Sequence, residues 1–386
     1  MKWLSFLIFF TVILSIHFLV NFYIYRKISL FLPPETIYRT IALTTFWISA
    51  SSYFAGRVLE KFYLSLFSDL LIWIGAIWFA FMLYFVLSFL VVDFLRLVDY
   101  LFGVFPSFIT RNFPNTNYIA GIIVFGMISL TVLFGFINSR YIVVKDLEMK
   151  IEKKAGNLTE LKITMFSDLH LGSMIGKKYA QKVVRMVNEQ NPDIILIPGD
   201  IIDEDIEPVL RDSICEELKK LRSKYGTYSI TGNHEYIGNA EKAVDYLTRN
   251  GINVLRDSSL LVDSSFYLVG REDRSIRQFT GRNRKPLPEI MKDVTKDLPV
   301  ILMDHQPFKL EEAEGLGADL QLSGHTHHGQ LWPFNFITEK IYELSWGYKM
   351  KGNTHYYVSC GVGGWGPPVR IGSRPEIVNI SLVFSK

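Results

Sequence analysis

The sequence is poor in cysteine and in net charge. Cys215 and Cys360 are the only cysteines in 386 residues, so no disulfide framework is expected and a reducing compartment is permitted. The formal net charge of +3 is too small to indicate a nucleic-acid partner. Internal repeats and low-complexity stretches are also missing from the C-terminal part of the chain. These absences exclude a disulfide-stapled module and a nucleic-acid-binding protein.

Charged residues are scarce as well, at 20% against 49% hydrophobic residues, which is too apolar for an ordinary soluble enzyme. The apolar excess lies before about residue 139, and the remainder has the composition of a globular domain. The sequence therefore predicts a helical transmembrane domain at 1–139 and a second domain at 140–386.

Four apolar runs in the first part approach the roughly 20 residues that a helix needs to span hydrocarbon. They occupy residues 3–25, 40–55, 70–92 and 118–137. The second is shorter and more polar than the others. The first has the alternative interpretation of a signal peptide, but its apolar core is too long and no small-residue cleavage site follows it. We expect about four transmembrane helices.

Four spans place both chain ends on one side of the membrane. Because lysine and arginine are enriched on the cytoplasmic side, the cations that flank the spans on each side predict the orientation. The first set is Lys2, Arg57, Lys61, Arg140, Lys145, Lys150, Lys153 and Lys154. The second set is Arg26, Lys27, Arg39, Arg96 and Arg111. The bias predicts an integral protein of the cell (inner) membrane with a cytoplasmic C-terminal domain. One helix fewer would reverse this orientation.

From about residue 141 the pattern changes to strand, loop and helix. Five short apolar runs, at 163–166, 194–198, 228–230, 300–303 and 319–322, each end at a polar cluster. Amphipathic segments at 179–190, 208–223 and 240–250 lie between three of them. This alternation predicts an α/β sheet covered by helices, with the polar clusters meeting beyond the carboxyl ends of the strands.

The polar clusters share the side chains that bind divalent metals. Together they supply Asp168, His170, Asp200, Asn233, His234, His305, His325 and His327. Any one of these histidines has the simpler interpretation of a buried, hydrogen-bonded residue. The whole set exceeds what one ion needs, so two metal ions fit better.

The ordered motifs carry a resemblance to a known family. The motifs D-x-H (168–170), GD-x-x-D (199–203), GNHE (232–235), H-x-P (305–307) and GHTH (324–327) resemble the calcineurin-like metallophosphoesterases over about residues 160–384. The segments GQLWPF, VSCGVGG and RIGSRPEI are similar to a membrane-associated branch that includes four-span phosphoesterases. The resemblance implies a four-layer αββα sandwich. That branch usually has glycine after GHTH, where this chain has His328, so a position behind the metal ligands and a solvent-exposed position both stay open for this side chain.

The resemblance also implies residue roles. Asp168, His170 and His327 would hold one ion, Asn233, His305 and His325 the other, and Asp200 would bridge them. Hydroxide between the ions would attack phosphorus. His234 would stay metal-free and act as a catalytic acid or charge stabiliser, with Asp203 orienting it, while Glu235 is expected to be a structural partner. The metals, Mn, Zn, Fe or Co, are not distinguished by these ligands.

The substrate is less well indicated. The basic segment 271–285 is either a solvated surface loop or a set of arginines that hold a diphosphate or an anionic lipid surface. The aromatic residues Trp332, Phe334, Phe336, Trp346 and Trp365 would form an apolar approach for acyl chains or belong to the core. The leading interpretation is a membrane-anchored phosphoesterase whose substrate is a phosphorylated small molecule or a lipid-linked phosphate such as UDP-2,3-diacylglucosamine in lipid A biosynthesis. The alternatives are a broad phosphomonoesterase or phosphodiesterase, and a non-catalytic membrane scaffold. The sequence does not predict the oligomeric state.

Overall fold

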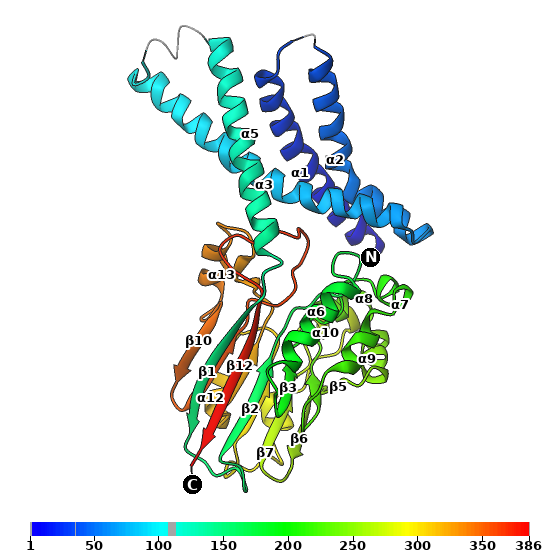
Figure 1. Ribbon diagram of the computed structural model, residues 1–386, viewed down its shortest axis with the longest axis vertical. Helices are drawn as coiled ribbons and strands as arrows, with labels where there is room; N and C mark the ends of the chain where they lie inside the picture. The colour runs from blue at the N-terminus through cyan, green and yellow to red at the C-terminus, as the bar shows by residue number, and fades with distance from the viewer. Residues whose placement is uncertain (1, 35, 107–112, 386) are drawn as a thin grey trace. The chain divides into compact units, whose positions relative to one another are not determined.

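The computed structural model describes residues 2–34, 36–106 and 113–385, and the chain divides into two compact units, Met1–Phe136 and Ile137–Lys386. The first unit is helical, and the second combines strands with helices (Figure 1). The functional division into a membrane domain ending at residue 139 and a catalytic domain starting at residue 140 stays a prediction.

The described helices that begin in the first unit cover the four predicted apolar runs. They are α1 (Lys2–Phe31), α2 (Ile37–Phe62), α3 (Leu66–Phe102) and α5 (Phe113–Asn138). At Gly75 of α3 a Cβ atom would lie only 2.2 Å from the backbone nitrogen of Tyr53 in α2. A small residue at this point lets the two backbones approach closely, as is common where membrane helices pack.

Two of the described helices are long and apolar enough to cross a bilayer, namely α3 and the Thr116–Asn138 part of α5. That α1 and α2 also cross, giving four spans, stays a prediction. Arg111, one of the cations used to predict the orientation, lies outside the described residues. The orientation of the chain therefore also stays a prediction.

The second unit contains two mixed six-stranded sheets. The first has the order β1 (Val143–Ile151), β12 (Glu376–Phe384), β2 (Glu160–Met165), β3 (Ile194–Ile197), β4 (Thr227–Ser229) and β5 (Asn253–Val254). The second has the order β10 (Gly347–Lys351), β11 (Thr354–Val358), β9 (Leu320–Ser323), β8 (Val300–Met303), β7 (Phe266–Gly270) and β6 (Ser258–Val262). Strands β2 to β5 run parallel, as do β7, β8, β9 and β11.

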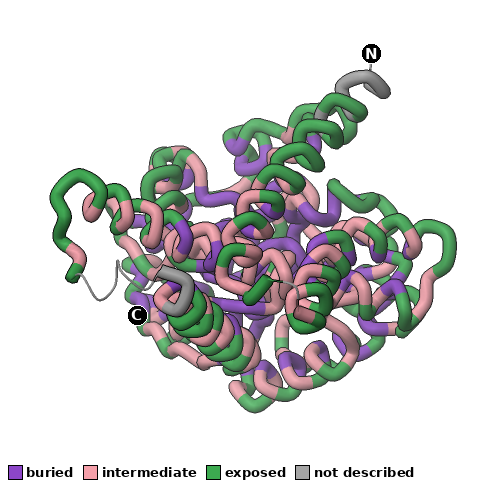
Figure 2. Tube along the Cα trace, turned by 90° about the horizontal axis from the view of Figure 1, so that it is seen from above, coloured by how far each residue is buried: buried purple, intermediate pink, exposed green. Residues whose placement is uncertain are grey.

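The hydrophobic core of this unit lies between and over the sheets. Ile163 and Leu196 of the first sheet share one buried cluster with Ile301 and Leu322 of the second. A second cluster joins the first sheet to α6 (Lys177–Asn188) and α9 (Ala240–Arg249), and a third joins the other sheet to α11 (Leu287–Ile290) and α12 (Glu311–Leu316). Figure 2 marks the buried residues along the trace in purple. The predicted α/β class is confirmed, and the four-layer arrangement stays a prediction.

The five predicted buried runs form strands β2, β3, β4, β8 and β9. Two of the three amphipathic segments form α6 and α9. The amphipathic segment at 208–223 forms two short helices, because α7 (Glu207–Arg211) ends before Ser213, whose φ of 49° is left-handed, and the chain continues as a 3-10 helix, η1 (Ile214–Lys220). A helix cannot run through a left-handed residue, and the apolar periodicity does not reveal this break.

Candidate metal centre

The predicted ligands follow the carboxyl ends of parallel strands from both sheets. Asp168 and His170 follow β2, Asp200 follows β3, Asn233 follows β4, His305 follows β8, and His325 and His327 follow β9. These seven side chains therefore meet at the carboxyl edge of the sheets, although they are far apart in sequence.

The backbone at these strand ends is held in an unusual conformation. Asp168, His170 and Asp200 have φ angles of 53°, 51° and 54°, in the left-handed region that costs a side-chain-bearing residue about 1–3 kcal/mol. The backbone at Gly232 also lies so close to Asp200 that no side chain fits there, because a Cβ at Gly232 would lie 2.0 Å from Oδ1 of Asp200. Strain of this kind at several neighbouring residues is typical of a functional site.

One group of ligand atoms consists of Asp168, His170 and His327. The Nε2 atoms of His170 and His327 are 3.1 Å apart, and Nε2 of His327 lies 3.6 Å from Oδ1 of Asp168. All three residues are buried. Their lone pairs can therefore converge on a single cation.

A second group consists of Asp200, His305 and His325. Nε2 of His305 lies 3.1 Å from Oδ2 of Asp200. Oδ1 of Asn233 joins this group, at 2.7 Å from Nδ1 of His325 and 3.2 Å from Nε2 of His305. The same Oδ2 of Asp200 lies 3.9 Å from Nε2 of His170 in the first group, so this carboxylate lies between the two groups.

The charges of these side chains fit divalent cations. Asp168 and Asp200 are both buried carboxylates, and buried negative charges require compensation by positive charge. Part of it comes from His305, because Asp200 and Asp168 raise the pKa of this histidine well above its ordinary value although burial opposes the shift. Burial and His305 in turn lower the pKa of His325 to about 3, and burial with His170 and Arg370 lowers the pKa of His327 well below its ordinary value. Neutral imidazoles beside carboxylates are the donors that first-row metals prefer.

His234 contacts Asp203 beside the first group. Its Nδ1 lies 2.9 Å from Oδ1 of Asp203, and its ring lies 4.5 Å from that of His170. Although burial opposes it, Asp200 and Asp203 raise the pKa of His234 to about 9. Oδ1 of Asp203 is also 3.6 Å from Nδ1 of His170, so one carboxylate contacts both imidazoles. The geometry agrees with an Asp203-oriented His234, whose catalytic role stays a prediction.

Glu235 supports the backbone of the site. Its buried carboxylate accepts hydrogen bonds from the amides of Asp200, Ile201, Ile202 and Gly232 at 2.7 to 3.1 Å. These bonds tie the turn after β3 to the start of α8 (Asn233–Gly238). Glu235 is thus a structural partner of the site, as predicted.

His328 points away from the ligand groups. Its Nδ1 lies 3.1 Å from Oγ of Ser345, its ring lies 5.1 Å from the ring of Trp346, and its Nε2 is 3.7 Å from Glu339. The side chain is only 11% exposed and its partner Ser345 is buried, so the solvent-exposed position is wrong for His328.

Sequence reasoning missed Arg370, which is fully buried next to the site. Its guanidinium donates to the carbonyls of Gly361 and Gly363 at 3.2 and 2.6 Å and lies 3.4 Å from Nδ1 of His327. Arg370 thereby fixes the loop beside this ligand. The RIGSRPEI motif contains Arg370, but the motif gives no sign of what the side chain contacts.

The basic segment divides into two kinds of arginine. Arg271 and Arg284 bind the two oxygens of Asp304 at 2.9 and 2.8 Å. Arg274 instead lies 5.0 Å over the ring of Phe308, and its Nε is buried without a hydrogen-bond partner. The interpretation of the whole segment as a solvated loop is therefore wrong for Arg271 and Arg284, whose guanidinium groups are largely buried in ion pairs.

The aromatic residues near the last motif also differ from one another. Trp332, Phe334, Phe336 and Trp365 are exposed, whereas Trp346 donates its indole N–H to Glu376 and packs under Lys145. The alternative that they all belong to the core is wrong. Trp365 lies beside the candidate metal centre, because its ring is 6.3 Å from that of His234.

Residues 161–329 match the family described as calcineurin-like phosphoesterase. A transmembrane protein with metallophosphoesterase domain from Danio rerio is 34% identical over 62% of this chain and 57% of its own length. An uncharacterized metallophosphoesterase of Campylobacter jejuni is 31% identical over 67% of this chain and 69% of its own length, and one of Aquifex aeolicus is 32% identical over 58% and 85%.

A solved 5'-nucleotidase precursor from Thermus thermophilus aligns with 13% identity and a TM-score of 0.36, covering 58% of this chain and 54% of that one. The chain spans a little over half the length of the Danio rerio protein. Its match to nearly the whole Aquifex aeolicus protein, together with the motifs above, shows that it belongs to the calcineurin-like metallophosphoesterases, a family of metal-dependent hydrolases.

Proposed function

We propose that the chain is a membrane-anchored phosphoesterase with a dinuclear metal centre. The observation that carries this proposal is the position of Asp200, whose Oδ2 lies 3.1 Å from His305 of one ligand group and 3.9 Å from His170 of the other. A carboxylate placed between two complete donor sets is what two neighbouring cations require. The two relatives named as transmembrane proteins and the two helices able to cross a bilayer support the membrane anchor.

The side chains divide the work as follows. Asp168, His170 and His327 would hold one ion, and Asn233, His305 and His325 the other. Two bound divalent ions supply Lewis-acid activation of water and of the phosphoryl oxygens at neutral pH. His234 forms a third candidate ligand group with His170 and Asp203, but His170 is already used by the first ion, so His234 would stay metal-free. It would donate a proton to the leaving oxygen or stabilise the developing phosphoryl charge, with Asp203 holding its ring in place.

Metal reconstitution tests this function. We expect detergent-purified, chelator-treated protein to be inactive on a generic phosphodiester and to regain activity with excess Mn or Zn, at two ions per chain by elemental analysis. Activity that persists without metal would refute the metal-dependent chemistry. A stoichiometry that stays at one ion would refute the dinuclear centre, and full loading without turnover on any phosphate ester would favour the non-catalytic scaffold.

We further propose that the substrate carries a second anionic group, as a diphosphate does, and that Arg274 binds it. Among the described residues Arg274 has no carboxylate within ion-pair distance, and burial with the neighbouring Arg284 lowers its pKa. Its positive charge is therefore poorly compensated, and an incoming phosphate would relieve this.

Two aromatic rings lie between Arg274 and the metal centre. The rings of Phe308, under Arg274, and Tyr342 are 4.6 Å apart, and the ring of Tyr342 lies 6.1 Å from that of His325. A phosphate bound by Arg274 would thus lie on the side of the second ligand group. Trp365, exposed near His234, supports an apolar approach for a lipid-linked substrate, for which UDP-2,3-diacylglucosamine is the natural probe.

Replacing Arg274 by glutamine tests this substrate class. We expect kcat/KM on the acylated diphosphate to fall about 10-fold or more, the scale of one lost charged hydrogen bond, with little change on bis(p-nitrophenyl) phosphate. Arg277→Gln is the matched control, because Arg277 is an exposed arginine of the same segment. Equal losses on both substrates, or equal effects of the two variants, would contradict the role of Arg274 and leave a broad phosphodiesterase.

A further inference from the structure

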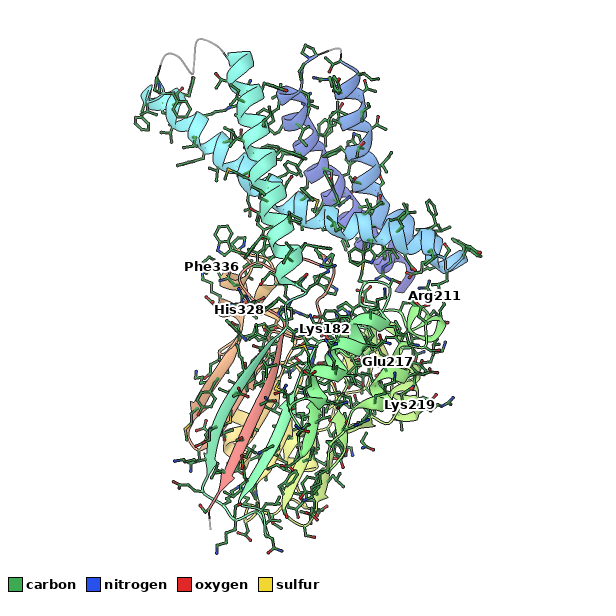
Figure 3. All side chains as sticks on the ribbon, viewed as in Figure 1. Lys182, Arg211, Glu217, Lys219, His328 and Phe336 are labelled. Atoms are coloured by element: carbon green, nitrogen blue, oxygen red, sulfur yellow. The ribbon has the colours of Figure 1, made fainter. Side chains whose placement is uncertain are left out.

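Helix α13 (Asn335–Ile341) is a surface helix with no buried residue. Phe334, Ile337 and Ile341 recur at helical spacing on one face and are 40%, 53% and 55% exposed. Phe336 is 56% exposed and is labelled in Figure 3 at the same end of the second unit as His328. Such a stripe normally packs on a core, so here it is left for a partner.

The apolar surface continues beyond this helix. Trp332 precedes it, and Trp365 is joined through Gln330, whose side chain accepts from the amide of Trp365 at 3.0 Å and donates to its carbonyl at 2.7 Å. We call Trp332, Phe334, Phe336, Ile337, Ile341 and Trp365 the apolar edge. Because Trp365 lies next to His234, the apolar edge extends to the rim of the metal centre.

The end of a candidate membrane span is bonded to the same loop as the apolar edge. Asn138, the last residue of α5 and part of the second unit, donates to the carbonyls of Arg370 and Ser373 at 3.0 and 2.8 Å. Between these two residues, Ile371 accepts a hydrogen bond from the amide of Trp332 at 2.8 Å. Trp332 of the apolar edge and Asn138, where the chain would leave the bilayer, therefore bind neighbouring residues of one loop.

Cations accompany these aromatic side chains. Arg374 lies 6.0 Å over the ring of Tyr141, and both are exposed, while Lys340 extends from α13 itself. Exposed aromatic residues beside arginine and lysine are typical of the lipid headgroup region, where the rings sit among the headgroups and the cations meet anionic lipid. On α13 itself the exposed Glu339 offsets Lys340, so the aromatic side chains, their position and Arg374 favour a lipid partner.

We propose that the apolar edge inserts into the interfacial region of the bilayer to which α5 leads, and that it holds the rim of the metal centre at the lipid surface. This inference rests on the membrane anchor but not on any substrate. Its test needs no turnover, so its failure is distinguishable from failure of the proposed function.

Lipid quenching of a fluorophore provides the test. Full-length protein with Phe336→Cys or Ile341→Cys is labelled with a nitrobenzoxadiazole and reconstituted into vesicles containing anionic lipid and lipid spin-labelled near the headgroup. Native Cys215 and Cys360 are fully buried and stay unlabelled. The control is Lys219→Cys, at an exposed position of η1 that Figure 3 labels on the other side of the unit.

We expect the labels at 336 and 341 to lose about half of their fluorescence or more, and the label at 219 to lose almost none. Phe336→Asp with Ile337→Asp should reduce the quenching at 341, because the change removes the inserted side chains. Equal quenching at all three positions would overturn the proposal. Disulfide cross-linking between copies at 336, without lipid quenching, would also overturn it and assign the surface to a second copy of the chain.

Discussion

Replacing Asp200 by asparagine is expected to lower kcat/KM by roughly 10³-fold or more and to remove at least one bound ion. Oδ2 of Asp200 lies near both His305 and His170, so the change removes charge from both ligand groups. A loss of about 4 kcal/mol of transition-state stabilisation, on the scale of metal-ion catalysis, corresponds to this factor. Asparagine keeps the shape of the side chain, which limits the effect on folding.

Thermal unfolding provides a second readout for the same variant. Bound metal stabilises the folded state, so a chelator should lower the Tm of the parent protein. Asp200→Asn should respond less, because it holds less metal, and its metal-free form should be no more stable than the metal-free parent. Although burial opposes the shift, His305 and His234 hold the pKa of Asp200 well below its ordinary value, so the ionised carboxylate stabilises the folded state.

Asp273→Asn is the matched control for this experiment. Asp273 is also a buried carboxylate near the site, but it bonds Gln306 and Ser275 instead of facing a ligand group. Its variant should keep the parental response to chelator. An Asp200→Asn variant that binds two ions and responds to chelator as the parent does would rule out the bridging position.

The strand ends of the site could be predicted from the sequence because the signal is local. Each of the five buried runs ends directly in residues such as Asp168 or His305, and parallel strands bring their carboxyl ends together. The division of the ligands between two ions came instead from the family resemblance. Residue types and spacing do not tell whether His170 faces His327 or His305.

Other features were not predictable because they depend on contacts between distant residues. A run of arginines gives no sign that Arg284 binds Asp304, 20 positions away, while Arg274 meets Phe308. Likewise β1 and β12 pair over nine residues at one edge of the first sheet, although the paired residues, such as Val143 and Glu376, are 233 positions apart and the strands have partly exposed, alternating side chains. Nothing local in either strand specifies this partner.

Replacing His234 by alanine is the second change expected to lower activity strongly. His234→Ala should bind two ions as the parent does and lose on the order of 100-fold or more in kcat on an alkyl phosphodiester, the usual scale for a positioned acid or charge stabiliser. His328→Ala is the control, since this neighbouring histidine contacts Ser345 and Glu339 away from the ligand groups. We expect its activity to match that of the parent. Full activity of His234→Ala on that alkyl phosphodiester, or loss of metal from the variant, would refute a metal-free catalytic role.

The choice of leaving group separates the two roles open to His234. A protonated His234, held by Asp203 at 2.9 Å, matters most when the leaving oxygen is strongly basic. If it protonates that oxygen, the loss in His234→Ala should be large for an alkyl phosphodiester and should nearly disappear for a p-nitrophenyl ester, whose phenolate leaves without a proton. If it stabilises charge on the phosphoryl group, the two substrates should lose equally, because that charge develops with either leaving group. We expect the first outcome, since the ring lies beside the ligand groups, where the departing oxygen would emerge, and a loss independent of the leaving group would assign His234 to the phosphoryl oxygens.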